Sequence, residues 1–321
     1  MRTVQLDADT QARHKLRNLI HSWLLIGGSL VLLGATAWAL AGPAGVIWAA
    51  MGGAVALAMS LRVSPAMVLR LYNARPITVN DFPEGVYVLR ELARRAGLPQ
   101  PPKLFYVPSR VMNAFAVGQP EESVICVTDG LLRGLNIRQL AGVLGHEISH
   151  IRNGDLRVMA IADLVSRMTS AMSVAGVFLL FLNLPLLLAG NAPFPWLGIL
   201  LLMAAPTLSA LMQLALSRAR EYDADLDAAG LTGDPEGLAA ALATLERRQG
   251  QMWEMMLPGQ RIPDPSILRS HPTTQDRIDR LMSLKPAGER RIDLPGDGRQ
   301  APIRVVPVVR PPRFRASGLW Y

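Results

Sequence analysis

Residues 168–217 read MTSAMSVAGVFLLFLNLPLLLAGNAPFPWLGILLLMAAPTLSALMQLALS and contain no Asp, Glu, Lys or Arg in 50 positions. Residues 18–61 form a second charge-free run, of 44 positions. A helix crosses the hydrocarbon core of a bilayer with about 20 apolar residues, so each run is long enough for two crossings. Each run also has turn-forming residues near its middle, at Gly42-Pro43 and at 190–193. We therefore expect four transmembrane helices, near residues 20–41, 44–61, 171–189 and 195–216.

The charge-free runs have two alternative interpretations. A buried helical hairpin of a water-soluble protein is one, but runs this long without any charge argue against it. A cleaved signal peptide is the other, because Ala39-Leu40-Ala41 resembles a cleavage site. The first apolar stretch exceeds the roughly 7–15 residues of a signal-peptide core, and another expected crossing follows at once, so this alternative is also disfavoured.

Basic residues flank the four expected crossings on one side only, and the two short connections carry no charge. Cytoplasmic loops carry an excess of Lys and Arg, so this side is expected to be the cytoplasm. The chain is then a multi-pass protein of the cytoplasmic (inner) membrane, with both termini and the polar segments 62–167 and 218–321 in the cytoplasm. The flanking residues are Arg2, Arg13, Lys15, Arg17, Arg62, Arg70, Arg75, Arg167, Arg218 and Arg220.

The net charge of +8 does not require a nucleic-acid partner, and none is expected. Residues 286–321 contribute a net +4 of it and are rich in proline. This tail is expected to fold poorly, and it is either attracted to the anionic headgroups of the lipid bilayer or simply solvated. The single cysteine, Cys126, excludes an internal disulfide and fits a reducing compartment.

The first polar segment has the helix and strand patterns of an α+β domain. Residues 84–96 have apolar side chains at helical spacing and end at Gly97. Asn136, with Gln139 three residues on, forms a capping-box pattern that starts a second helix. Asn153-Gly154 should end that helix, and Asp155 can cap another. Three short runs rich in β-branched or aromatic residues predict a small β-sheet: KLFYVP (103–108), NAFAVG (113–118) and SVICVT (123–128).

The second polar segment is expected to be helical. SRAREYDADLDAAG continues the fourth expected crossing as a helix that closes at Gly230. Asp234-Pro235 opens another helix over 235–248, and a last helix is expected over 273–284.

Residues 145–155, GHEISHIRNGD, place His146 and His150 four positions apart on the helix that starts at Asn136. Residues i and i+4 share a helical face, so both imidazoles can bind one metal ion. Glu147 lies one position on, where its carboxylate can reach a metal-bound water without crowding the coordination sphere. This is the logic of the H-E-x-x-H zinc site, in which zinc activates the water and the carboxylate takes its proton.

A catalytic zinc also needs a third protein ligand and one open position. The metzincin pattern is excluded, because Asn153 and Leu156 stand where it requires Gly and His. A glutamate from a separate helix is the other source, and Glu221 and Asp225 share a helical face in SRAREYDAD. Glu221 can bind zinc while Asp225 accepts a hydrogen bond from a ligand imidazole. The alternative is that both are solvated acids of a charged helix.

GHEISHIRNGD together with SRAREYDAD resembles the HtpX-like membrane zinc metalloproteases, which are related to the CAAX prenyl endopeptidases. NAFAVG, VTDGLL and SHPTTQDRIDRL add to the resemblance, as does a zinc motif between the second and third crossings. It covers the chain up to about residue 285 and leaves out the basic tail. One departure is Thr273, where the family pattern has a second proline after His271-Pro272.

The resemblance implies a mainly α integral membrane protein with four transmembrane helices and a cytoplasmic α+β gluzincin metalloprotease domain carrying a small β-sheet. It implies one Zn²⁺ per chain held by His146, His150 and Glu221, with Glu147 as general base. Its activity would be endoproteolysis of damaged or misfolded membrane proteins on the cytoplasmic side.

The resemblance also suggests residues around the metal. Asn113-Ala114-Phe115 is similar to the edge strand that pairs with substrate backbone, with simple sheet packing as the alternative. Asp225 and His271 are expected just outside the ligands; His271 either stabilises the oxyanion or, as we favour, caps its helix.

The expected organisation leaves two rival functions open. One is specific processing of a prenylated or signal-bearing substrate, and the other is a non-catalytic, zinc-stabilised membrane scaffold. A scaffold needs the two histidines but not Glu147 between them, so this acid favours catalysis. The expected segments are a cytoplasmic N-terminus (1–19), a transmembrane hairpin (20–61), a catalytic segment with the zinc motif (62–167), a second hairpin (168–217), a catalytic segment with the third ligand (218–285) and the tail (286–321).

Overall fold

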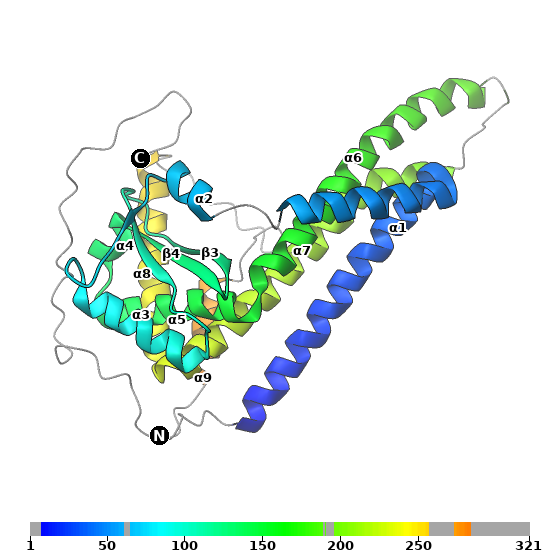
Figure 1. Cartoon of the computed structure of the whole chain (residues 1–321). Helices are drawn as coiled ribbons and strands as arrows, with labels where there is room; N and C mark the ends of the chain where they lie inside the picture. The colour runs from blue at the N-terminus through cyan, green and yellow to red at the C-terminus, as the bar shows by residue number, and fades with distance from the viewer. Residues whose placement is uncertain (1–7, 61–64, 189, 191–195, 257–272, 284–321) are drawn as a thin grey trace.

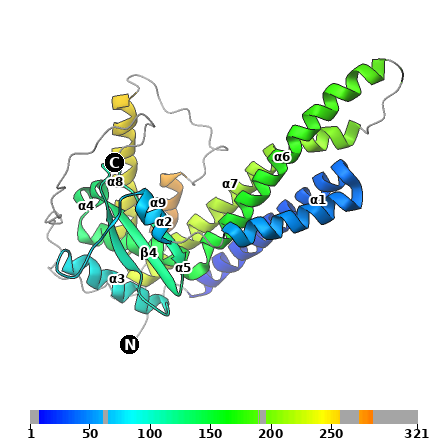
Figure 2. The ribbon, with the colours of Figure 1, turned by 45° about the horizontal axis from the view of Figure 1, so that its top comes forward.

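The computed structural model describes residues 8–60, 65–188, 190, 196–256 and 273–283. These residues form two parts. A bundle of long helices projects from one side of an α+β part, as Figures 1 and 2 show. The predicted basic tail and His271 lie outside the described residues.

The bundle consists of α1 (Ala8–Ser60), α6 (Asp155–Leu188) and α7 (Trp196–Thr232). Among the described residues, 3 helices are long and apolar enough to cross a membrane, over Leu19–Ala58, Asp155–Pro185 and Trp196–Thr232. Many of their apolar side chains are exposed, for example Trp48, Phe178 and Leu197. Exposure of such an apolar surface to water would be unfavourable in free energy, whereas contact with lipid tails is not.

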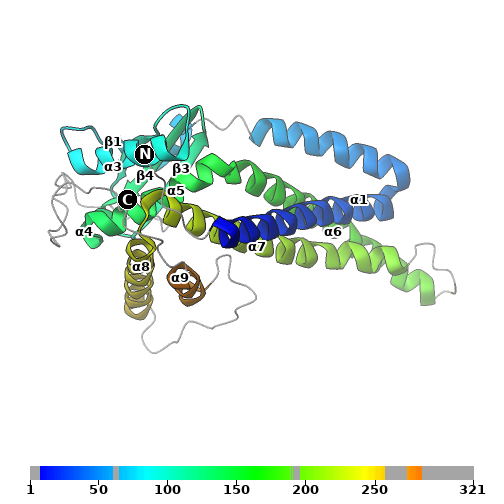
Figure 3. The same ribbon diagram turned by 90° about the horizontal axis from the view of Figure 1, so that it is seen from below.

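Helix α1 consists of two helical arms separated by a break in the helical backbone. Its backbone leaves helical geometry at Ala41 (φ −146°, ψ 25°) and Gly42 (φ 58°, ψ −145°), just before Pro43. The first arm lies along α7, as Figure 3 shows from below, and the returning arm approaches α6, where a Cβ atom at Gly53 would lie 3.5 Å from Sδ of Met168. The turn predicted at Gly42-Pro43 is therefore present, because glycine tolerates the positive φ there and proline cannot continue the preceding helix.

The predicted β-sheet is confirmed, with strands β2 (Lys103–Val107), β3 (Ala114–Gln119) and β4 (Glu122–Thr128). A two-residue strand β1 (Arg75–Pro76), which the sequence patterns did not predict, pairs with β2. The strand order is β1-β2-β4-β3, with β2 and β4 parallel and the other pairs antiparallel. In the described sheet β3 is therefore an edge strand, paired only with β4.

Helices cover both faces of this sheet. Helices α3 (Pro83–Ala96) and α5 (Ile137–Asn153) share an apolar core with one face, whose fully buried members include Leu89, Ile125 and Leu144. The short helix α2 (Pro65–Leu71) packs near the other face, where Tyr72 contacts Phe115 at 5.1 Å between ring centroids. Helices α4 (Asp129–Gly134), α8 (Pro235–Met256) and α9 (Thr274–Ser283) complete the part.

Both ends of α5 follow the local signals in the sequence. The side chains of Asn136 and Gln139 form the predicted capping box at its start. Gly154 adopts the left-handed conformation (φ 67°) at its end, and α6 begins at Asp155. This break redirects the chain from the α+β part into the bundle immediately after the H-E-x-x-H motif.

The end of α7 differs from the sequence-based expectation, whereas the start of α6 agrees with it. Helix α7 does not close at Gly230 but runs to Thr232, and Gly233 takes the left-handed position (φ 67°) instead. Leu231 and Thr232 are buried, so the added residues gain packing that the local pattern did not show. Helix α6 begins at Asp155, the residue expected to cap a helix, and it continues as one helix into the crossing expected near 171–189, ending at Leu188.

Candidate metal centre

The two histidines of the H-E-x-x-H motif lie on one face of α5. Their Nε2 atoms point toward each other and are 3.1 Å apart. His146 is buried and His150 is half-buried. The predicted convergence of the two imidazoles is therefore confirmed.

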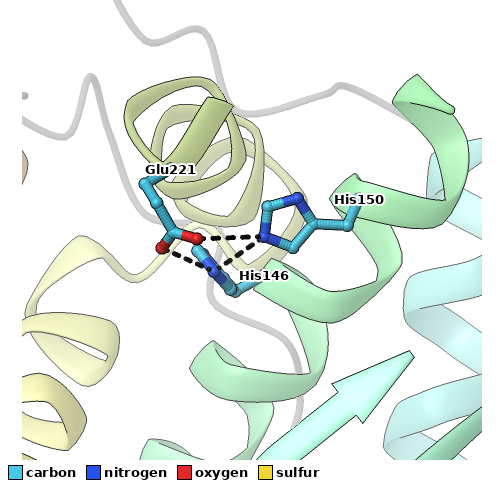
Figure 4. A group of neighbouring side chains, drawn as sticks. All are labelled: His146, His150 and Glu221. Carbon is cyan, nitrogen blue, oxygen red and sulfur yellow. Dashed lines mark hydrogen bonds and ion pairs between the residues drawn. The ribbon is translucent and has the colours of Figure 1, made fainter. Parts of the chain in front are cut away.

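Glu221 comes from α7 and faces both rings, as Figure 4 shows. Its Oε2 is 3.4 Å from Nε2 of His146, and its Oε1 is 3.8 Å from Nε2 of His150. Ligand atoms of a tetrahedral zinc, with bonds of about 2.0–2.1 Å, are separated by roughly 3.3 Å. The distances between the ligand atoms of these three side chains are close to this value. The three residues could therefore hold a metal ion.

A carboxylate lies behind each imidazole. Nδ1 of His146 is 3.0 Å from Oδ1 of Asp225, and Nδ1 of His150 is 2.7 Å from Oδ2 of Asp155. A carboxylate at Nδ1 keeps the proton on that nitrogen and leaves a lone pair on Nε2. Two such lone pairs then face the carboxylate of Glu221, an arrangement of acceptors that a cation would satisfy.

Each of these carboxylates is paired with an arginine. Arg277, on α9, donates from Nε to Oδ2 of Asp225 at 2.7 Å and from Nη2 to Oδ1 at 2.6 Å. Its Nη1 is also 3.1 Å from Oε2 of Glu221. On the other side, Nη1 of Arg220 is 3.1 Å from Oδ1 of Asp155. The guanidinium groups hold the acids in place and compensate buried negative charge.

The acids around His146 make the site attractive to positive charge. Burial lowers the pKa of His146, but the hydrogen bonds of Asp225 and Glu221 raise it more, to about 10. In the absence of a metal the site would therefore take up a proton in its place. A metal ion that binds here has to displace that proton.

Glu147 lies beside the histidines and against the β-sheet. Its side chain is half-buried, and its carboxylate accepts a hydrogen bond from the backbone N–H of Ala116 on β3. Burial raises the pKa of Glu147 above its usual value, and Glu221 raises it further, while the two histidines and the Ala116 hydrogen bond lower it. A carboxylate with a raised pKa is a better proton acceptor, as a general base requires.

The free edge of β3 faces Glu147. Asn113 accepts a hydrogen bond from the backbone N–H of Thr128 at 3.1 Å, which makes these two a hydrogen-bonded pair across β3 and β4. In an antiparallel ladder such pairs alternate, so Phe115 also pairs with β4. The backbone groups of Ala114 and Ala116 point away from β4, toward the unpaired edge. Of the predicted substrate residues, Ala114 therefore offers its backbone at this edge, whereas the Phe115 ring packs on Tyr72.

The chain matches the model of Peptidase family M48 over residues 85–285, which is more than half of its length. This chain belongs to peptidase family M48. The match begins in α3, includes the H-E-x-x-H helix and the α6–α7 hairpin, and extends beyond α9.

Curated relatives match about three quarters or more of the chain. The "Protease HtpX homolog" of Methylibium petroleiphilum is 32% identical over 291 residues, covering 84% of this chain and 98% of that protein. The protein of the same name from Paraburkholderia phytofirmans is 34% identical over 272 residues, covering 76% and 91%. The chain is thus an HtpX-like M48 metalloprotease with helices apolar enough for a membrane.

One solved structure has a similar fold. The crystal structure of S. mikatae Ste24p superposes with a TM-score of 0.51 at 21% identity, covering 84% of this chain and 66% of that one. At this identity the likeness shows the fold alone. It supports a mainly helical architecture with a small mixed sheet.

Three residues of the site were not assigned this role from the sequence. Asp155 was expected only as a helix cap, although it lies five positions after His150 in the motif itself. Arg220 directly precedes Glu221, and its charge was used only to orient the membrane helices. Arg277 lies 52 residues from Asp225, and no local pattern connects the two.

The metal group yields a first prediction. Glu221→Ala should lose bound zinc and activity together, because two imidazoles alone hold zinc weakly. Asp225→Ala should cost less, on the order of 10–100-fold in affinity, because it only orients His146. Zinc per chain is measured after purification with a competing chelator, and Glu246→Ala, an exposed acid on α8, serves as control. Full zinc occupancy in Glu221→Ala would contradict the ligand assignment.

Proposed function

We propose that this chain is a zinc-dependent endopeptidase of the cytoplasmic membrane that cleaves misfolded membrane proteins on the cytoplasmic side. The observation that carries the proposal is the convergence of His146, His150 and Glu221 beside Glu147, at the open edge of β3. A scaffold role would leave Glu147 without a purpose in this position.

In the proposed mechanism, His146, His150 and Glu221 hold one zinc ion per chain. When bound, the ion lowers the pKa of a coordinated water toward about 7 and polarises the scissile carbonyl. Glu147 takes the proton of the attacking water, and the backbone N–H of Ala116 holds its carboxylate in place. Asp225 and Asp155 keep the imidazole protons on Nδ1, away from the metal side.

The substrate is proposed to add a strand to β3. An extended peptide that pairs with an exposed edge is recognised through its backbone, with little dependence on sequence. Asn113, Ala114 and Phe115 form the start of this edge, and Ala114 offers its backbone N–H and C=O there. Recognition of this kind suits an enzyme that accepts many damaged proteins, and it favours quality control over the processing of one specific substrate.

The proposed site lies close to the membrane surface. Glu221 follows the end of the charge-free run at Ser217 by four residues of continuous helix. At 1.5 Å per residue this is about 6 Å. We propose that the two arms of α1, together with α6 and α7, make four crossings with both polar segments in the cytoplasm. A site at this depth would accept segments that are leaving the bilayer or lying on it.

Replacement of the base tests the mechanism. Glu147→Gln keeps the shape of the side chain but cannot accept the proton, so we expect a folded, zinc-loaded protein that no longer cleaves. It should still hold unfolded membrane substrates. The purified variant is assayed for metal content, proteolysis of a model membrane substrate and co-purification of that substrate. Substantial cleavage by the zinc-loaded variant would refute the role of Glu147, and loss of zinc would make Glu147 a ligand.

Removal of one edge donor tests the proposed strand pairing. Ala114→Pro deletes an N–H that β4 does not use, at the first residue of an edge strand, where proline is tolerated. One lost hydrogen bond, at about 1 kcal/mol, should lower kcat/KM for an extended peptide roughly fivefold. Ala114→Val retains the donor and serves as control. Equal losses in both variants would show that the side chain, and not the edge donor, matters.

Reporter fusions test the topology. Fusions at Pro43 and Ala192 should report the outer side of the membrane, because the connections there carry no positive charge. Fusions after Arg75 and at the C-terminus should report the cytoplasm. A cytoplasmic signal at Pro43 would reduce the number of crossings, and an outer signal after Arg75 would invert the orientation.

A further inference from the structure

Asp155 is a buried acid at the junction between the metal group and the bundle. It is the first residue of α6, and only 2% of its surface is exposed. Its Oδ2 lies 2.7 Å from Nδ1 of His150, and its Oδ1 lies 3.1 Å from Nη1 of Arg220. One carboxylate thus contacts a candidate metal ligand and a cation from another helix at the same time.

Arg220 places that cation on α7, immediately before Glu221. Its side chain is largely buried, with 14% exposed. The ion pair therefore joins the start of α6 to α7 at the level of the metal group. These two helices are both apolar enough to cross a membrane, and they pack closely along their lengths.

Because the Asp155–Arg220 ion pair is buried, its energy depends strongly on the distance between the two groups. A buried carboxylate or guanidinium is costly unless its partner is in place, so neither group can move alone without losing the compensation. A relative shift of α6 and α7 would separate the pair or drag Asp155 away from the imidazole. The orientation of His150 thus depends on how the two bundle helices are aligned.

The corresponding arrangement at His146 is built differently. There Asp225 contacts the imidazole, and Arg277 from α9 pairs with that acid. Arg277 belongs to a helix that packs on α8 and α7 in the α+β part. Only the His150 side receives its acid from the first residue of a candidate membrane helix.

We propose that Asp155 and Arg220 are positioning residues that orient His150 for metal binding and make metal affinity depend on the alignment of α6 with α7. The inference rests on the proposed zinc site. Asp155 fixes the proton of His150 on Nδ1 and turns Nε2 toward the metal. Arg220 acts through Asp155, whose carboxylate it holds in position.

The test uses the full chain in lipid nanodiscs and measures zinc affinity by chelator competition. The visible absorption spectrum of the Co²⁺-loaded protein reports the geometry of the ligands, and the melting temperature of the metal-free protein reports folding. The variants are Asp155→Ala, Asp155→Asn and Arg220→Met. Asp163→Ala is the matched control, because Asp163 is an acid of the same helix whose side chain is 48% exposed and pairs with Arg167 at 2.8 Å.

Asp155→Ala should weaken zinc binding on the order of 10–100-fold and change the Co²⁺ spectrum, whereas Asp163→Ala should change neither. Asp155→Asn separates positioning from helix capping, because Asn caps helices as well as Asp does. It should lose zinc affinity on the order of tenfold, since it forms no ion pair with Arg220. Wild-type affinity in Asp155→Asn, or a lowered melting temperature with unchanged zinc affinity in both variants, would overturn the proposal.

The double variant tests whether Arg220 acts through Asp155. Arg220→Met alone should weaken zinc binding, but it should add less than about threefold to the loss in Asp155→Ala, because the shared interaction is already gone. No loss in Arg220→Met, or a full multiplication of the two losses, would refute the coupling. Failure of the wild-type protein to bind zinc would instead refute the proposed function, so the two failures are distinguishable.

Discussion

The close crossing of α5 and α7 is the constraint on which the metal group depends. A Cβ atom at Gly145 would lie 3.3 Å from Cγ2 of Thr232 and 3.5 Å from Cβ of Ala228, and one at Gly142 would lie 2.8 Å from Cα of Leu238. The absence of side chains at these two positions lets α5 approach α7 and the start of α8. This short distance between α5 and α7 brings the carboxylate of Glu221 close to the imidazoles of His146 and His150.

The same helix α7 ties the metal group to the bundle. It runs without interruption from Trp196 to Thr232, so the apolar stretch and Glu221 belong to one element. The depth of the proposed site is therefore set by helical rise and not by a flexible connection. Helix α6 begins at Asp155, five residues after His150, and α7 carries Glu221, so both helices of the α6–α7 hairpin reach the metal group.

The ends of α5 and the position of the two histidines on it could be predicted from local sequence patterns. The capping box at Asn136, the left-handed Gly154 and the i, i+4 histidines each act within one or two helical turns, so their patterns survive in any context. The helix end predicted at Gly230 was wrong, because the end of α7 depends on packing, which local patterns do not contain. Arg277 could not be assigned for the same reason, since its contact with Asp225 exists only after α9 has packed.

Charge balance explains why the site contains so many ionised groups. With neutral imidazoles, the acids Glu147, Asp155, Glu221 and Asp225 and the guanidiniums of Arg220 and Arg277 leave a formal charge of two negative. Each arginine pairs with the acid behind one imidazole, Arg277 also contacts Glu221, and the carboxylates of Glu221 and Glu147 lie nearest the centre. A divalent cation would bring this partly dehydrated site to neutrality, whereas a single proton on His146 would not. The arginine pairs thus direct the remaining negative charge to the place where a metal and its water would lie.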